Sequence, residues 1–177
     1  LGLQYDERLN LVGMTASDGA QYDFSYDTLG NLTQSVDPLG AVITLKHTTD
    51  LIRLDWLRDA RGNLMDFTSD ARGNLTRITY PDASYEQFGR DGVGNVVTVK
   101  NRRGQTITLT YDTEGRLTRK LWPDGRRFDY SYDTRGNVIS VGDTVTGTIM
   151  MEYDDREFLT RIEYPNGHWF TFDYNDA

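Results

Sequence analysis

The chain has 177 residues, a formal net charge of -8 and no cysteine, which is enough length for one sizeable domain. The lack of cysteine excludes disulfides, thiolate chemistry and cysteine-based metal sites, and the negative charge opposes binding to nucleic-acid phosphates. No run of about 18 apolar residues and no signal peptide is visible, so the sequence predicts no membrane insertion.

A repeat of about 21 residues runs along the chain. Taking tyrosine as position 1, the step is constant except between His47 and Ser69, where it is one residue longer. We therefore predict a single domain, 1–177, of eight repeats, with a ninth just beginning. The repeat starts are Tyr5, Tyr26, His47, Ser69, Arg90, Tyr111, Tyr132, Tyr153 and Tyr174.

Two glycine positions predict two turns in each repeat. The first turn opens with Asp at position 2 and closes with Gly at position 5, where positive φ is needed. The second has Pro at position 13 and Gly at position 15, as in a three-residue hairpin loop. The turn residues singled out are Asp27 and Gly30, Asp112 and Gly115, Asp133 and Gly136, and the second-turn residues Pro123, Asp124 and Gly125. Position 5 departs from glycine at Leu9, Leu51 and Glu157.

The segments between the turns read as strands. Apolar residues alternate with polar ones at positions 18, 20 and the next position 1, as in Phe128, Tyr130 and Tyr132. This period of two predicts strands with one buried face. The other strand of each repeat has apolar residues at positions 7 and 10, a spacing that does not fit a flat strand. We therefore interpret position 7 as packing beside the turn, at a bulge.

The irregular third repeat tests this register. The sequence "DARGN" occurs at Asp59 and again at Asp70, half a repeat further along the chain. The first copy therefore takes the place of a second turn, and the strands are expected to persist on both sides.

These elements predict an all-β fold of tandem β-hairpin repeats. Eight hairpins give about sixteen short strands, and a twisted open sheet seldom exceeds about ten strands without curling, splitting or closing. We expect a curved or spiralling antiparallel sheet that forms a wall one strand thick. Its exposed strand edges predict either closure of the sheet on itself or self-association between copies.

The repeat wording resembles a known family. "YDTEGRLTRKLWPDG" and "YDTLGNLTQSVDPLG" are similar to the YD repeats, also called Rhs repeats, along essentially the whole chain. Members include bacterial Rhs and polymorphic toxins, shell proteins of insecticidal toxin complexes, and teneurins. The resemblance implies a spiralling β-shell, which in the toxins encloses a C-terminal toxic domain. It also implies a secreted or cell-surface bacterial location as part of a larger protein.

The resemblance carries no catalytic residue to this chain. The self-cleaving Rhs-associated segment of the toxins does not occur, and the chain begins and stops within repeats, so we expect a fragment of a longer protein. Paired carboxylates such as Asp112 and Asp133 are turn residues by register. "GRDGVGNV" lies in register with a turn, and His47 and His168 lack metal-spaced partners. We predict no enzyme activity and no cofactor.

The position before the proline turn carries the most suggestive functional feature. Tyr80, Trp122 and Tyr164 recur there in every second repeat. They could form a sugar-binding row along one rim, or each ring could shield its own turn, and we favour the second alternative.

Two functions remain open. The first is a structural β-shell segment that encloses or displays a C-terminal toxin domain, with the remaining repeats and that domain as partners. The alternative is a repeat module of a secreted or cell-surface protein that binds glycans or another protein.

Overall fold

The computed structural model describes residues 1–49 and 53–175, which contain strands and turns and no helix. The chain divides into two compact units, Leu1–Gln87 and Phe88–Ala177. In each unit every strand pairs antiparallel with the next strand in sequence, so the predicted all-β hairpin fold is confirmed.

The first unit contains nine strands, the last of which continues past its boundary. They are β1 (Gly2–Tyr5), β2 (Leu11–Thr15), β3 (Gln21–Tyr26), β4 (Leu32–Val36), β5 (Val42–His47), β6 (Leu54–Arg58), β7 (Leu64–Ser69), β8 (Leu75–Thr79) and β9 (Tyr85–Arg90).

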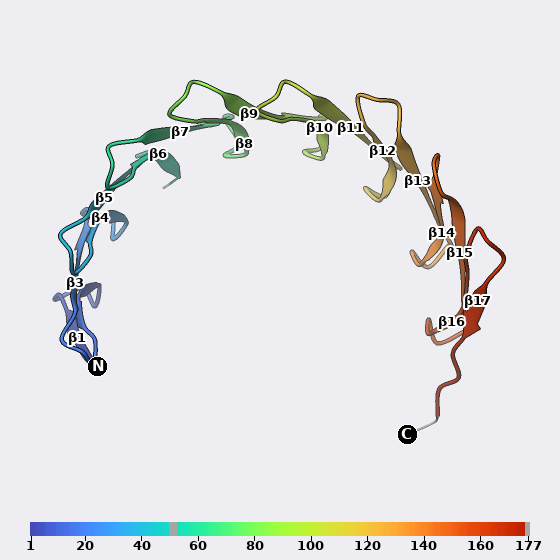
Figure 1. The fold of residues 1–177 in the computed structure, drawn as a ribbon, viewed down its shortest axis with the longest axis horizontal. Helices are drawn as coiled ribbons and strands as arrows, with labels where there is room; N and C mark the ends of the chain where they lie inside the picture. The colour runs from blue at the N-terminus through green and yellow to red at the C-terminus, as the bar shows by residue number, and fades with distance from the viewer. Residues whose placement is uncertain (50–52, 176–177) are drawn as a thin grey trace. The chain divides into compact units, whose positions relative to one another are not determined.

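The second unit contains eight further strands. They are β10 (Val96–Lys100), β11 (Thr106–Tyr111), β12 (Leu117–Leu121), β13 (Arg127–Tyr132), β14 (Val138–Asp143), β15 (Gly147–Tyr153), β16 (Leu159–Glu163) and β17 (Trp169–Thr171). Within each unit the strands form a curved sheet of a single layer (Figure 1). The described part thus has 17 strands, one more than about sixteen, because β1 precedes the first complete repeat.

The structure contains the predicted bulge at position 7. In the sixth repeat Tyr111 is paired with Leu117, whereas the preceding Thr110 is paired with Arg119, so Thr118 is the extra residue. The same register shift recurs at the end of β1, β3, β5, β7, β13 and β15. The spacing of three between apolar positions therefore results from one inserted residue.

The apolar face is only half-buried, which differs from the expected buried face. We call the face that bears positions 1, 18 and 20 the tyrosine face; Phe128, Tyr130 and Tyr132 represent it in β13. Among the described residues no hydrophobic residue is buried, and Asp143 is the buried charged one. The physical reason is that a single-layer sheet supplies no second layer to cover this face.

Candidate functional site

The first turn is organised by the aspartate at position 2, which the third repeat replaces with Thr48. In residues 27–31 the amide of Gly30 donates to the carbonyl of Asp27 at 3.1 Å, and Gly30 has φ +86°. The Asp27 carboxylate accepts bonds from the backbone amides of Leu29 and Asn31, both at 2.9 Å, and from the Asn31 side chain. The Asn31 side-chain bond is the largest cause that lowers the pKa of Asp27. The carboxylate therefore takes part in building the turn.

The turns at Asp112 and Asp133 have the same construction. Gly115 and Gly136 close them with φ of +79° and +99°. Hydrogen bonds from Arg116 lower the pKa of Asp112, led by its backbone amide, and the Asn137 side chain is the leading cause of the lowered pKa at Asp133. The structure places these carboxylates where they stabilise turns, because each accepts several hydrogen bonds from its own turn.

Where position 1 is a tyrosine, its hydroxyl can tie the repeat to the repeat before. The Tyr132 hydroxyl donates to the carbonyl of Leu117 at 2.8 Å, which is position 7 of the preceding repeat and part of the bulge. Burial raises the pKa of Tyr132. The same bond, always to a residue 15 positions earlier, is made by Tyr26, Tyr111, Tyr153 and Tyr174. This role was not predicted from the sequence, although the constant interval between position 7 and the next position 1 encodes it.

The threonines at position 8 satisfy a second bulge carbonyl. Thr118 Oγ1 donates to the carbonyl of Thr110 at 3.1 Å, directly across the register shift. Thr33, Thr76 and Thr160 make the equivalent bond. Together, the tyrosine and the threonine compensate for carbonyls that the interrupted ladder leaves at each bulge.

The second turn places proline at its first corner. The amide of Gly125 donates to the carbonyl of Trp122 at 3.0 Å, so Pro123 and Asp124 occupy the two corners. Gly125 has φ +87°, and the Asp124 carboxylate accepts from the amide of Arg126 at 3.0 Å. In the third repeat, residues 59–63 form this turn between β6 and β7, with the same backbone bonds. Leu51, a departure from glycine at position 5, lies outside the described residues.

The predicted aromatic residues pack beside their own turns. Trp122 lies edge-on to Phe128 with ring centroids 5.3 Å apart, and Lys120 Nζ lies 4.7 Å from the Trp122 ring centroid. Tyr164 makes a similar edge contact with Phe170 at 6.1 Å. Tyr80 is half-buried after β8, in the other unit. These contacts resemble turn shielding, and the glycan-binding hypothesis stays a prediction.

An ion pair between a half-exposed arginine and a buried aspartate links two neighbouring second turns and was not predicted. Arg126 Nη2 donates to Asp143 Oδ2 at 2.8 Å, and the Asp143 side chain is 6% exposed. The Arg126 bond is the leading cause that lowers the pKa of Asp143 to about 2, with further bonds from Val145 and Thr146. No sequence pattern indicated this pair, because its partners lie in adjacent turns and are distant along the chain.

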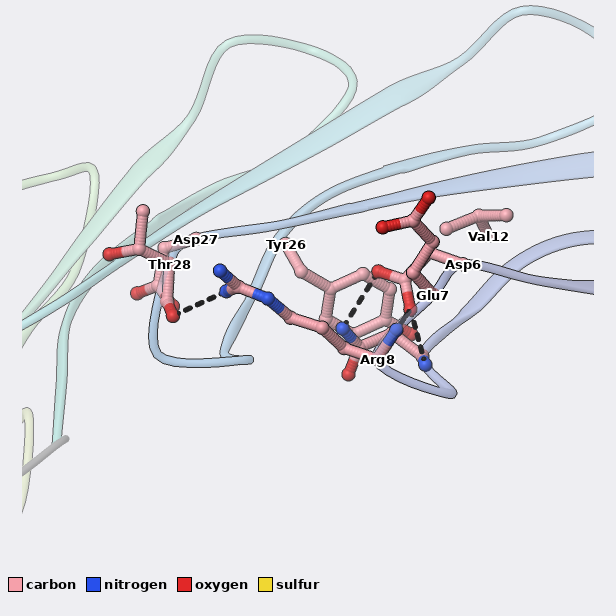
Figure 2. A pocket seen from close by; sticks show the side chains of 8 residues that line it. Asp6, Glu7, Arg8, Val12, Tyr26, Asp27 and Thr28 are labelled. Atoms are coloured by element: carbon pink, nitrogen blue, oxygen red, sulfur yellow. Dashed lines mark hydrogen bonds between the residues drawn. The ribbon is translucent and has the colours of Figure 1, made fainter.

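Three shallow recesses lie between consecutive first turns. Each has a position-1 tyrosine and a position-8 valine or isoleucine among its lining residues, with the two turns as walls. The Tyr26 recess, of about 440 Å³, is lined by Asp6, Glu7, Arg8, Asn10, Val12, Tyr26, Asp27 and Thr28. The Tyr111 recess, of about 650 Å³, is lined by Asp91, Val93, Asn95, Val97, Leu109, Thr110, Tyr111, Asp112, Thr113, Glu114 and Gly115. The Tyr153 recess, of about 360 Å³, is lined by Asp133, Thr134, Arg135, Ile139, Met151, Glu152, Tyr153, Asp154 and Asp155. In the first, Arg8 reaches across to the next turn (Figure 2).

The two histidines and the glycine-rich segment lie in strands and turns of the repeats. His47 is half-buried at the tyrosine position of β5, and His168 is exposed in the turn before β17. The glycines of "GRDGVGNV" lie at the end of β9 and in the turn at residues 91–95. Within residues 1–49 and 53–175 no three His, Asp or Glu side chains gather as a metal site would require, and no helix has the length and apolar character to cross a membrane.

Two family models match this sequence. The RHS repeat model matches residues 5–42, and the teneurin YD-shell model matches residues 90–177. A search of curated proteins finds no match. The hairpin repeats therefore define a structural β-shell protein. The chain belongs to the YD-repeat, or Rhs-repeat, family.

Solved structures of similar fold come from Tc toxins. The crystal structure of TcdB2-TccC3 matches with a TM-score of 0.70 at 18% identity, over 88% of this chain and 10% of that chain. The Photorhabdus luminescens Tc holotoxin pore with mutated TccC3 gives the same four values. TcdB2-TccC3 without its hypervariable C-terminal region matches with a TM-score of 0.59 at 13% identity, over 92% of this chain and 11% of that chain. The chain thus spans about a tenth of the length of these structures.

Proposed function

We propose that this chain is a wall segment of an Rhs-type shell that encloses or displays a C-terminal toxin domain. The observation that carries the proposal is the half-buried tyrosine face of a single-layer sheet. In β13 this face presents Phe128, Tyr130 and Tyr132, and among the described residues no hydrophobic residue is buried. An apolar face of this kind is stabilised when other polypeptide covers it. Family membership and the fold shared with Tc toxin structures support a shell role.

The mechanism of such a wall is steric. Asp and Gly set the corners of the hairpins, the tyrosines of five repeats tie them to the previous repeats, and the strand ladder gives rigidity. The family and the fold are those of structural shell repeats, and we propose that the chain has no enzyme activity of its own. Secretion or display at the bacterial cell surface, as part of a larger protein, belongs to the same proposal.

The test uses the complete parent protein. We expect its C-terminal domain to resist protease while the shell is folded, and to be digested after the shell is unfolded by denaturant. The matched control is the C-terminal domain expressed alone, which should be digested at once under native conditions. Equal digestion of the domain with and without a folded shell would refute enclosure.

Glycan binding remains the alternative function. Tyr164 is 36% exposed and could offer a ring to a sugar, whereas Lys120 already lies over Trp122. A glycan-array signal that disappears in both Trp122→Ala and Tyr164→Ala would favour this module over the shell. Loss of signal in neither variant would count against it.

Self-association through sheet edges is a further part of the proposal. The terminal strands β1 and β17 consist of exposed residues, and exposed edges pair readily with other strands. Light scattering that finds a monomer at all concentrations would contradict self-association.

A further inference from the structure

The Tyr111 recess differs from its two counterparts because no arginine is among its lining residues in the described part of the chain. In the Tyr26 recess, Arg8 at position 4 donates to the carbonyl of Thr28 at 2.6 Å. In the Tyr153 recess, Arg135 at position 4 donates to the carbonyl of Asp155 at 2.7 Å. The Tyr111 recess has Val93 at that position, and Val93 is 85% exposed.

A third arginine shows how a guanidinium sits against the tyrosine itself. Arg116, at position 6, lies with its guanidinium carbon 4.8 Å from the centroid of the Tyr132 ring. Its Nη1 donates to the carbonyl of Asp133 at 3.3 Å, and its Nε donates to the Asp112 carboxylate at 2.7 Å. Ring, carbonyl and carboxylate thus hold one planar cation between two first turns. At the Tyr111 recess, position 6 is the shorter Asn95.

The Tyr111 recess presents the same three kinds of acceptor. The Tyr111 ring is held in place because its hydroxyl donates to the carbonyl of Val96 at 2.9 Å. Burial raises the pKa of Asp91, but bonds from the Asn95 side chain and from turn amides lower it overall, so this carboxylate is charged at neutral pH. By the register of the repeats, the carbonyls of Asp112 and Thr113 correspond to those that accept from Arg116, Arg8 and Arg135.

The charge and size of the Tyr111 recess agree with a cation from outside. Its lining contains three carboxylates, Asp91, Asp112 and Glu114, and neither lysine nor arginine. Arg116 pairs with both Glu114 at 3.0 Å and Asp112 at 2.7 Å, so Asp91 is the main source of negative charge that Arg116 does not neutralise. At about 650 Å³, it is the largest of the three recesses described.

We propose that the Tyr111 recess binds an arginine side chain of another polypeptide segment, with the guanidinium on the Tyr111 ring and its N–H groups on the turn acceptors. A planar guanidinium fits a ring and several fixed acceptors better than an ammonium does. The acidic rim favours this occupant over a phenyl ring, although Phe158 stacks on Tyr174 at 4.9 Å in the last repeat. The site does not depend on whether the wall encloses a toxin domain.

The test titrates N-acetyl-arginine methylamide into the chain and follows the tyrosine ring signals by NMR. We expect a saturable shift of the Tyr111 signal, assigned from its absence in Tyr111→Phe, with Kd of about 1–10 mM for a single partly exposed site. The citrulline analogue, which is neutral and nearly the same shape, should bind at least about 5-fold more weakly, because it lacks the cation.

A variant that fills the recess provides the matched control. Val93→Arg places an arginine at position 4, as in the two counterparts, and should weaken binding of the arginine probe at Tyr111 by at least about 5-fold. Val93→Gln adds a longer side chain without a charge at the same lining position, so it should weaken binding less than Val93→Arg does. Both variants should keep the wild-type circular dichroism spectrum, since Val93 is exposed.

Four results would overturn the proposal. They are no shift at Tyr111 in the wild-type chain, equal binding of the citrulline analogue, equal binding of the lysine analogue, and tighter binding of the phenylalanine analogue. All four are measured on the wild-type chain, and Tyr111→Phe serves only to assign the signal, so a failure of Val93→Arg or Val93→Gln to fold does not affect them.

Discussion

Removing the Tyr132 hydroxyl isolates the bond that joins consecutive repeats. Tyr132→Phe keeps the ring on the tyrosine face and under the Arg116 guanidinium, 4.8 Å from the ring centroid. It deletes the 2.8 Å bond to the carbonyl of Leu117, a residue at the bulge opposite Tyr111. The change therefore perturbs one hydrogen bond and leaves the turn chemistry of Asp133 and Gly136 in place.

The expected loss follows from the half-buried setting of the bond. A typical intramolecular hydrogen bond contributes about 0.5–1.5 kcal/mol, and an unsatisfied buried carbonyl costs about 1–3 kcal/mol. Water can reach a half-buried carbonyl and recover part of that cost. We therefore expect Tyr132→Phe to lower the free energy of unfolding by about 1–1.5 kcal/mol.

Urea denaturation followed by circular dichroism measures this loss as a lower midpoint with an unchanged slope. Tyr5→Phe is the matched control, because Tyr5 is 54% exposed and its hydroxyl has no hydrogen-bond partner among the described residues. A surface change of that kind alters stability by less than about 0.5 kcal/mol. Equal midpoints for the two variants would refute the idea that the tyrosine hydroxyl couples the repeats.

Three further predictions concern the turns. Glu157 has φ +67°, so Glu157→Gly should raise the free energy of unfolding by about 0.5–1 kcal/mol, and a lower urea midpoint would contradict this. Gly147→Ala should lower the free energy of unfolding by about 2 kcal/mol or more, because the new Cβ would lie 2.7 Å from Pro165 at a residue with φ +99°. Gly136→Ala is the control and should cost only the backbone penalty of about 1 kcal/mol, since nothing lies within 4 Å of its new Cβ. Equal losses in the two variants would contradict a clash with Pro165. The pKa of Asp143 is lowered from 3.8 to about 2, so its contribution is present above pH 3.8 and is lost as the pH falls towards 2. The midpoint gap between wild type and Asp143→Asn should therefore shrink between pH 4 and pH 2, and a constant gap would argue against this ion pair.

The repeat, the two turns and the bulge were predictable because they depend on local sequence. Glycine at φ +79° in Gly115 and proline at the corner in Pro123 follow from backbone sterics within a few residues. The spacing of apolar positions indicated the inserted residue. Local sequence did not predict the positive φ of Leu9, Ala83 and Glu157, because these residues are not glycine and adopt it only where their turns require it.

Features that join neighbouring repeats were not predicted. The bond from Tyr132 to Leu117 and the ion pair of Arg126 with Asp143 join partners that are distant along the chain, and they depend on strand register. The Tyr111 recess depends on which side chains stand at positions 4 and 6 of one repeat, and it becomes apparent only by comparison with the filled recesses. The tyrosine face is half-buried and not buried as expected. The alternation of apolar and polar residues along a strand indicates which face is apolar, but it does not indicate what covers that face.

The duplicated "DARGN" has a consequence for how such genes can change length. Its copies begin at Asp59 and Asp70 and build the same turn at opposite ends of β7. Recombination between them would delete half a repeat, including β7, and later hairpins would then place their tyrosine-bonded turns on the opposite rim. Misalignment by a whole repeat keeps every turn on its own rim. Selection on the fold should therefore permit additions and losses of whole repeats, and remove half-repeat deletions between the two copies of "DARGN".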